Sequence, residues 1–288
     1  MVAATACLRP NLGFADSSPN LGLNTWSLRA LSQEEALPVI IQVMKQTGLH
    51  DCQLIFSHVE PAKLNPVFPV GLLSAPKLPP TPQQLEERKK TEAALTEWRL
   101  SVPMSYFEKI RDAFEKQGLR INCYAARLGG SEAEIDRQFL MAKALGVSSI
   151  NARVAEPMTS VVAAAAEKHR LIVGFQFSDV NMMQRQLKAS KYFRMDPDIG
   201  DMTKAKIDAL QFVQANYQSM SSLDLKDAAL GGASVPFGEG DSRMKEVLQF
   251  LNEKKVPFSA YVDCDYAGTG RSTEEVKKCV SYVRSMIA

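Results

Sequence analysis

The stretch LRINCYAARLGGSEAEIDRQFLMAKALGVSSIN, residues 119–151, decides the fold class because two short β-rich runs flank a capped helical pattern. The apolar runs 119–124 and 147–151 have the length and composition of buried strands. Between them, Ser131 is typical of a helix N-cap and Gly146 of a helix end. Two strands joined by a helix pair in parallel through a crossover, so this stretch predicts a βαβ unit.

The same alternation of strand and helix patterns continues along the chain. It predicts an α/β fold, a single (β/α)8 TIM barrel rather than two domains, because parallel strands need helical crossovers. A doubly wound open sheet is the alternative, but the chain has no G-x-G-x-x-G after its first strand and no P-loop. The expected strands are residues 21–25, 52–56, 119–124, 147–151, 170–177, 192–196, 221–225 and 258–263, and the expected helices are 32–48, 103–118, 131–146, 159–169, 204–217, 242–255 and 272–287.

Two segments depart from this repeat. Residues 1–20 are small, polar and rich in Pro, Gly and Ser, and we expect a flexible arm there, in either a cytoplasmic protein or the mature part of an exported one. Residues 58–102 are first Pro-rich and then helical and charged. Because function in such barrels collects on the βα loops, we expect this insertion after the second strand to form a flap at the catalytic face of a barrel that spans 21–288.

Composition narrows the chemistry. The 34 Lys and Arg against 32 Asp and Glu leave a formal charge of +2, which disfavours a broad nucleic-acid-binding face. Three histidines and five scattered cysteines disfavour a zinc cluster or a disulfide framework. No apolar run approaches the roughly 18 residues of a membrane span. Carboxylates are therefore the abundant reactive groups.

Polar groups interrupt the apolar runs at the ends of most expected strands, where barrel enzymes carry their active sites. Three carboxylates and one amide follow four consecutive strands and should meet in one pocket: Gln176, Asp198, Asp224 and Asp263. Carboxylates that converge repel one another unless a proton or a cation intervenes, and an all-oxygen set suits Mg2+, Mn2+ or Ca2+. The alternative is that these groups are spread apart and solvated. The polar positions at the ends of all expected strands are Asn24, Ser57, His58, Glu60, Tyr124, Arg127, Asn151, Arg153, Glu156, Gln176, Asp179, Asp196, Asp198, Asp201, Asp224, Lys226, Asp227, Asp263 and Asp265.

Several of these positions are candidates for substrate binding. His58 and Glu60 could hydrogen-bond to hydroxyl groups of a ligand, although a structural loop contact is an equal alternative. Trp26 could stack on a face of the ligand or simply be buried. Asn24 and Arg153 complete this group by their places at the ends of the first and fourth strands.

A second group of candidates lies after the seventh strand. Lys226 could hold a developing oxyanion or a phosphate, or pair with Asp227. Glu239 stands between Gly238 and Gly240, where backbone freedom would let N–H groups approach a ligand, but a lone G-x-G is a weak phosphate signal.

Over residues 21–288 the sequence resembles the sugar phosphate isomerase/epimerase family, whose members are xylose-isomerase-like TIM barrels. The resemblance rests on motifs that include LGLNTWSLR (21–29), DPDIGD (196–201), SLDLKD (222–227), VPFGEGD (235–241) and VDCDY (262–266). It implies a divalent metal, Mn2+ or Mg2+, held at Gln176, Asp198, Asp224 and Asp263. It also implies proton transfer through an enediolate of an open-chain sugar, with catalytic roles for Asp263, Lys226 and Gln176.

Only Asp198 matches the family's metal ligands. The resemblance places Glu or His where Gln176 stands, His at Asp224 and Glu at Asp263, so it leaves open whether metal binding and turnover are retained. An amide at Gln176 cannot serve as a general base, and Asp263 is one methylene shorter than Glu.

We therefore expect a metal-dependent sugar or sugar-phosphate isomerase or epimerase. The alternatives are a homologue that binds a carbohydrate without turnover and a metal-dependent lyase or hydrolase acting on a keto-sugar glycoside. The expected partner is a small carbohydrate, and a homo-oligomer remains open.

Overall fold

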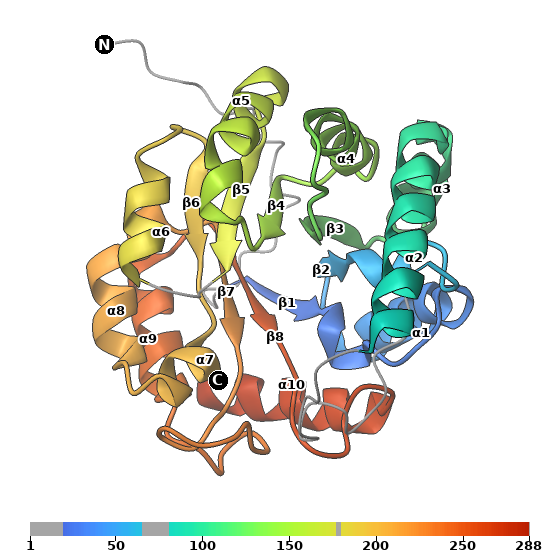
Figure 1. Cartoon of the computed structure of the whole chain (residues 1–288). Helices are drawn as coiled ribbons and strands as arrows, with labels where there is room; N and C mark the ends of the chain where they lie inside the picture. Colours follow the sequence, from blue (N-terminus) through green and yellow to red (C-terminus); the bar gives the residue numbers. More distant parts are fainter. Residues whose placement is uncertain (1–19, 65–80, 177–179, 288) are drawn as a thin grey trace.

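The computed structural model describes residues 20–64, 81–176 and 180–287. Eight parallel strands run in the sheet order β6-β5-β4-β3-β2-β1-β8-β7 and form a nearly closed barrel (Figure 1). All eight expected strands are confirmed: β1 (Leu21–Asn24), β2 (Asp51–Ile55), β3 (Arg120–Ala125), β4 (Ser149–Ala152), β5 (Ile172–Gln176), β6 (Phe193–Asp196), β7 (Ser222–Leu225) and β8 (Ser259–Val262). Isolated bridges close the ring between β6 and β7, one of them joining Asp198 to Asp224.

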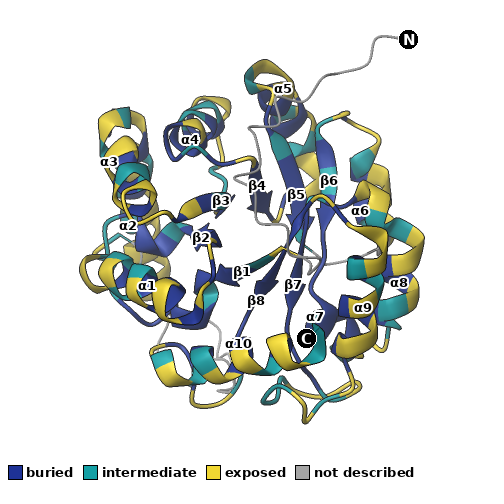
Figure 2. Ribbon diagram, turned by 180° about the vertical axis from the view of Figure 1, so that it is seen from behind, coloured by how far each residue is buried: buried dark blue, intermediate teal, exposed yellow. Residues whose placement is uncertain are grey.

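Helices surround the barrel, and their buried faces are turned toward the strands (Figure 2). Their bounds are α1 (Gln33–Thr47), α2 (Pro82–Ser101), α3 (Met104–Glu115), α4 (Glu132–Ala144), α5 (Thr159–His169), α6 (Val180–Leu187), α7 (Ile199–Lys204), α8 (Ala209–Asn216), α9 (Met244–Lys254) and α10 (Thr273–Ile287), with short 3-10 turns η1 (Thr25–Leu28), η2 (Phe56–His58), η3 (Glu156–Met158) and η4 (Tyr217–Ser219). The (β/α)8 prediction is confirmed. Among the described residues, no helix combines the length and the apolar character needed to cross a membrane.

One expected helix is shorter than predicted. Residues 204–217 do not form a continuous helix, because α7 ends at Lys204 and Lys206 adopts a left-handed conformation with φ 59°. The side chain of Asp208 then accepts a hydrogen bond from the backbone N–H of Gln211 and starts α8 anew. The periodic pattern of apolar residues spans this break and hides it.

Gly22 and Tyr261 illustrate how the barrel interior is filled. The Tyr261 ring is buried between the strands, and a Cβ atom at Gly22 would lie 2.5 Å from it. Because no real contact is that short, only glycine at this position leaves room for the ring. The apolar layers below the strand ends thus form a packed core, and the open space lies above them.

Within the 58–102 insertion, the structure describes residues 58–64 and 81–102. Its helix α2 packs against α4, and it is anchored by Arg99, whose guanidinium lies 2.6 Å from Glu60 and 2.7 Å from Glu134. All three side chains are buried. Ser131 caps α4 as expected, but the Glu134 carboxylate contacts Arg99 instead of completing a capping box. The flap remains a prediction, and the expected arm at 1–20 lies almost entirely outside the described residues.

Candidate functional site

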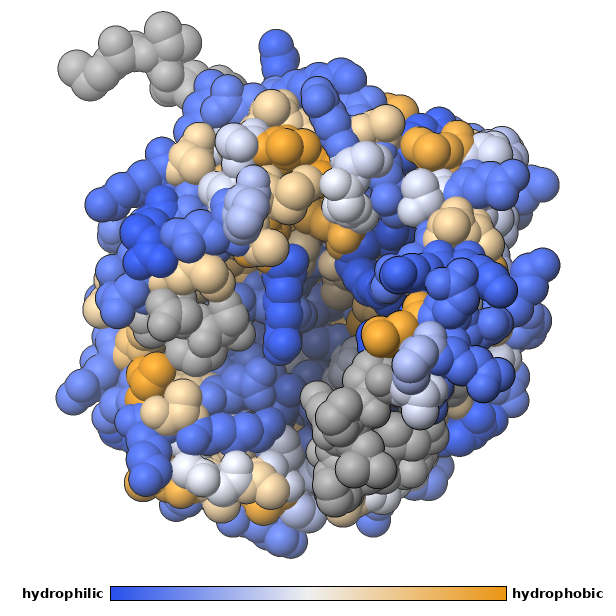
Figure 3. All heavy atoms as spheres, viewed as in Figure 1, coloured by the Kyte–Doolittle hydropathy of each residue, from blue (hydrophilic) through white to orange (hydrophobic). Residues whose placement is uncertain are grey.

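A cavity of about 830 Å³ opens at the carboxyl ends of the strands. Figure 3 shows this face of the molecule hollowed near its middle, with hydrophilic side chains around the hollow. The volume lies in the range of small-molecule sites. The cavity is lined by residues from all eight strands or the loops that follow them, so barrel closure creates it.

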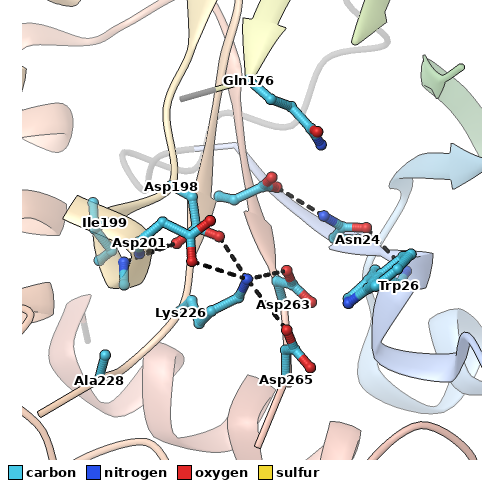
Figure 4. Close-up of polar contacts among 12 residues, drawn as sticks. Asn24, Trp26, Gln176, Asp198, Ile199, Asp201, Lys226, Ala228, Asp263 and Asp265 are labelled. Carbon is cyan, nitrogen blue, oxygen red and sulfur yellow. Dashed lines mark hydrogen bonds and ion pairs between the residues drawn. The ribbon is translucent and has the colours of Figure 1, made fainter. Parts of the chain in front are cut away.

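Lys226, directly after β7, lies at the centre of a group of aspartates. Its Nζ atom is 2.7 Å from Asp198, 3.2 Å from Asp263, 3.5 Å from Asp265 and 3.9 Å from Asp201 (Figure 4). Burial alone would lower the pKa of Lys226, but the surrounding carboxylates outweigh that effect and hold the pKa well above its ordinary value. The ammonium therefore stays charged and is unsuited to act as a nucleophile or to form a Schiff base.

Asp198 positions this ammonium and begins α7 at the same time. One carboxylate oxygen accepts hydrogen bonds from the backbone N–H groups of Gly200 at 2.8 Å and Asp201 at 3.0 Å. The other oxygen contacts Lys226. A Cβ atom at residue 200 would lie 2.8 Å from the Lys226 side chain, so the glycine of DPDIGD lets the lysine pass.

Below the lysine, three amides and two aspartates connect five strands in what we call the polar belt: Asn24, Gln53, Asn151, Asp196 and Asp224. Asp224 accepts hydrogen bonds from Asn24 at 3.0 Å and from Gln53 at 3.4 Å. The Asn151 amide donates to Gln53 at 3.1 Å and to Asp196. Burial raises the pKa of Asp196 to about 7 and raises that of Asp224 well above its ordinary value. Asn151 Oδ1 has no hydrogen-bond partner among the described residues, so the belt offers a free acceptor.

Asp263 faces the cavity from the end of β8. Its Oδ2 atom contacts Lys226, and its Oδ1 atom is buried with no hydrogen-bond partner in the described part of the chain. Burial, opposed in part by Lys226, raises the pKa of Asp263 to about 7. A carboxyl group with a pKa near neutrality can both take up and release a proton, as a general acid–base residue must.

Gln176 does not join the carboxylates. Figure 4 shows its amide apart from the group around Lys226, and its oxygen accepts a hydrogen bond at 3.2 Å from Arg153 instead. Both side chains line the upper part of the cavity. Trp26 lines it on the opposite side, with Arg29 stacked on its ring at 5.7 Å and paired with Asp265 at 2.9 Å.

Three expected substrate-binding residues lie elsewhere. His58 is buried between Thr25 and the Leu28 carbonyl, and burial lowers its pKa to about 4. Glu60 is fully buried against Arg99. Neither is among the described residues that line the cavity, so the structure gives no support to their expected contact with a sugar.

The structure gives no support to the expected role of Glu239, the third of these residues, either. Glu239 is exposed and does not belong to the described lining of the cavity. The nearby N–H groups of Gly238 and Gly240 donate to the buried carboxylate of Asp227 at 2.8 and 3.2 Å, so they are not available to a ligand. The loop with the sequence GEG, residues 238–240, wraps around Asp227. A Cβ atom at residue 240 would collide with the Asp227 carboxylate, which explains the glycine at that position.

Three members of the polar belt had no predicted role. Asn151 and Asp196 were expected only as polar strand ends, and Gln53 was not singled out because it stands inside an apolar run. An amide within an otherwise apolar barrel strand is the signal that would have found Gln53, since every buried polar group needs a partner.

The carboxylates also bear on metal binding. Oxygens of Asp198, Asp224 and Asp263 lie within 4.8 Å of one another, close enough that the three residues could hold a metal ion. Lys226, however, already contacts two of them. A divalent ion would have to lie about 2.0–2.6 Å from the same oxygens. In this arrangement the ammonium lies against two of the three carboxylates that a divalent ion would use.

No protein-family model matches the sequence, and no curated protein matches it. Solved structures do match. A sugar phosphate isomerase/epimerase from Parabacteroides distasonis superposes with a TM-score of 0.61 at 12% identity, covering 96% of this chain and 98% of that one. A xylose isomerase domain protein from Planctomyces limnophilus gives a TM-score of 0.63 at 11% identity, with 93% and 96% coverage. The fold is that of the xylose isomerase-like TIM barrels.

A third match is the probable 3-DHS dehydratase of petrobactin synthesis from Bacillus anthracis, with a TM-score of 0.65, 11% identity, and coverage of 92% of this chain and 98% of that one. At such identities the likeness establishes the fold and leaves the reaction to be argued from the site.

Proposed function

We propose that the cavity binds an open-chain sugar or a related polyhydroxy carbonyl compound and moves a proton at the carbon next to the carbonyl, as an isomerase or epimerase. The observation that carries this proposal is the juxtaposition of Asp263 and Lys226 at 3.2 Å on the cavity wall. One is a proton acceptor and the other a fixed positive charge, the two groups that enolisation requires.

The two residues divide the reaction between them. The Asp263 carboxylate removes the proton from the carbon next to the carbonyl, and the electron pair moves onto the carbonyl oxygen. The fixed positive charge of Lys226 stabilises that oxygen as its negative charge develops. In an isomerase the protonated Asp263 then returns the proton to the former carbonyl carbon, while the hydroxyl proton of the neighbouring oxygen moves to the former carbonyl oxygen, so that the carbonyl group changes place. Lys226 keeps its own proton throughout, as its raised pKa requires.

The polar belt favours a neutral substrate rich in hydroxyl groups. The buried acceptors Asn151 Oδ1 and Asp263 Oδ1 have no hydrogen-bond partner among the described residues, and hydroxyls are donors that supply one. The described lining contains six aspartates and four cationic side chains, Arg29, Arg153, Lys204 and Lys226. Because Asp196, Asp224 and Asp263 have raised pKa values, the lining is close to neutral and offers a phosphate group no excess of positive charge.

The Mn2+ or Mg2+ that the resemblance implies is not part of this proposal, because the ammonium of Lys226 takes the cation position. Proteins of the same fold are named as D-psicose 3-epimerase and as 3-keto-D-glucoside 4-epimerase from E. coli, and these names support the substrate class.

The test is proton exchange in deuterated water across a panel of unphosphorylated ketoses, aldoses and keto-glycosides, followed by NMR. We expect deuterium to appear at the carbon next to the carbonyl, and Asp263→Asn to slow this by at least about 100-fold. Asp112→Asn, on the distant surface of α3, is the matched control and should exchange as the wild type does.

Two alternatives have readouts in the same experiment. Tight binding of a sugar without proton exchange would replace the proposal by a carbohydrate-binding role. The observation that favours this role is that Gln176, Asp224 and Asp263 differ from the metal ligands of the family that the sequence resembles. Loss of a leaving group from a keto-glycoside would indicate a lyase instead, a class to which the dehydratase of the same fold points.

A further inference from the structure

We propose that Lys226 replaces the divalent metal ion, so that the protein carries its site cation as a side chain and holds no resident metal. The proposal concerns the same cavity but stands on the contacts of Lys226, not on the proposed reaction. Its test needs no substrate, so that its failure and the failure of the proposed function can be told apart.

The contacts of Lys226 match those of a bound cation. Its ammonium has three donors and no acceptor, and three carboxylates lie within 3.5 Å of it: Asp198, Asp263 and Asp265. The side chain is only 7% exposed. The Lys226 side chain passes over Gly200, which has no Cβ atom to obstruct it. Its partner Asp198 is fixed in place as the N-cap of α7.

The three carboxylates of the candidate metal set are also largely occupied. Both oxygens of Asp198 have partners, one on the α7 backbone and one on Lys226. Asp224 accepts hydrogen bonds from Asn24 and Gln53. Among these three residues, only Asp263 has an oxygen, Oδ1, without a hydrogen-bond partner in the described structure. A metal ion bound by all three carboxylates would have to displace the ammonium from Asp198 and Asp263.

Charge explains why one cation excludes the other. Four aspartates of the cluster are at least nine-tenths buried, Asp196, Asp198, Asp224 and Asp263, and Lys226 is the buried cation among them. A divalent ion on the same carboxylates would lie within a few ångströms of a fixed positive charge and be repelled. If the ammonium is removed, the same oxygens form an uncompensated set of hard ligands, which favours Mg2+, Mn2+ or Ca2+.

The experiment compares metal binding in the wild type and in Lys226→Met, which keeps an unbranched side chain one atom shorter and removes its charge. Proteins purified without chelator are analysed for metal content, and their melting temperatures are measured at pH 8 with Mn2+, Mg2+ and Ca2+. We expect the wild type to hold far less than one metal per chain and to shift by less than about 1 °C, and Lys226→Met to rise by about 5 °C or more at saturating Mn2+.

Two controls isolate the role of the ammonium. Lys226→Arg keeps a cation in the cluster and should gain no metal binding. Lys168→Met removes a lysine that contacts Asp136 at 2.7 Å on the exposed side of α5, outside the described lining of the cavity, and should behave as the wild type does.

One metal per chain in the wild type, or a wild-type shift as large as that of Lys226→Met, would overturn the proposal. A folded Lys226→Met protein that binds no metal would overturn it as well, because the ammonium would then not occupy a cation site. If Lys226→Met does not fold, the metal content and melting temperature of the wild type still decide the question.

Discussion

The Nζ atom of Lys226 lies 2.7 Å from Oδ2 of Asp198, and Asp198 is at the same time the N-cap of α7. The contact joins the residue after β7 to the residue that starts the helix after β6, at the point where the barrel closes through isolated bridges. One ion pair thus links β6 and β7 where only isolated bridges join them, and it places a buried positive charge in the cavity wall.

Lys226→Met should destabilise the protein by about 3–5 kcal/mol at pH 8, because removing one partner leaves buried carboxylates uncompensated. The loss should shrink toward pH 5, where the aspartates with raised pKa values become protonated. Urea unfolding at both pH values measures this. Lys204→Met, which breaks a partly exposed pair, should cost less than about 1 kcal/mol. Equal losses in the two variants would refute the assignment.

The raised pKa of Asp263 should make stability fall as the pH rises. The folded state binds this proton more tightly than the unfolded state, since the pKa is about 7 in the folded protein against an ordinary value of 3.8. The stabilising contribution is present below pH 4 and is lost between about pH 4 and pH 7. The difference between the melting curves of the wild type and Asp263→Asn over this range isolates the residue. A difference that does not change with pH would contradict the raised pKa.

A neutral sugar should stabilise the protein more than its phosphate ester does. The described lining has no excess of positive charge to hold a phosphate dianion, because six aspartates lie among its four cationic side chains, while hydroxyls satisfy the acceptors Asn151 Oδ1 and Asp263 Oδ1. Melting-temperature shifts with matched pairs of neutral and phosphorylated ketoses at equal concentration provide the comparison. Larger shifts with the phosphate esters would contradict this expectation and implicate Arg153 and Lys204 in phosphate binding.

Asp227→Ala should destabilise the protein by about 3 kcal/mol or more and open the loop at 235–242 to proteolysis. The Asp227 carboxylate accepts hydrogen bonds from four backbone N–H groups, those of Ala228, Gly238, Gly240 and Ser242. These donors would be left without their acceptor. Glu239→Gln, on the exposed side of the same loop, should change stability by less than about 0.5 kcal/mol. Limited proteolysis and urea unfolding would show whether the two variants differ as stated.

The repeat of strands and helices could be predicted from the sequence because each element depends on local patterns of residues. Apolar runs, the Ser131 cap and the glycine stops each act over a few residues, and all eight strands follow from them. The break at Lys206 could not be predicted in this way. The apolar residues on both of its sides keep the helical spacing, although the backbone at Lys206 is left-handed.

The convergence of Asp198, Asp224 and Asp263 also followed from sequence, because consecutive parallel strands place their ends side by side. The partners of Lys226 did not follow from sequence. Asp227 is its neighbour in the chain, but the two side chains point in different directions after β7 ends at Leu225. Lys226 turns into the cavity, while Asp227 turns into the loop at 235–242.

By itself, then, the sequence determined the barrel and the end of the barrel at which its acidic groups gather, since both depend on local periodicity and strand order. Only the tertiary structure decided that an ammonium lies among those groups, that Gln176 stands apart from them, and that His58 and Glu60 face the interior. These outcomes depend on side-chain directions and on distances of a few ångströms between strands far apart in the chain, and no local pattern specifies them.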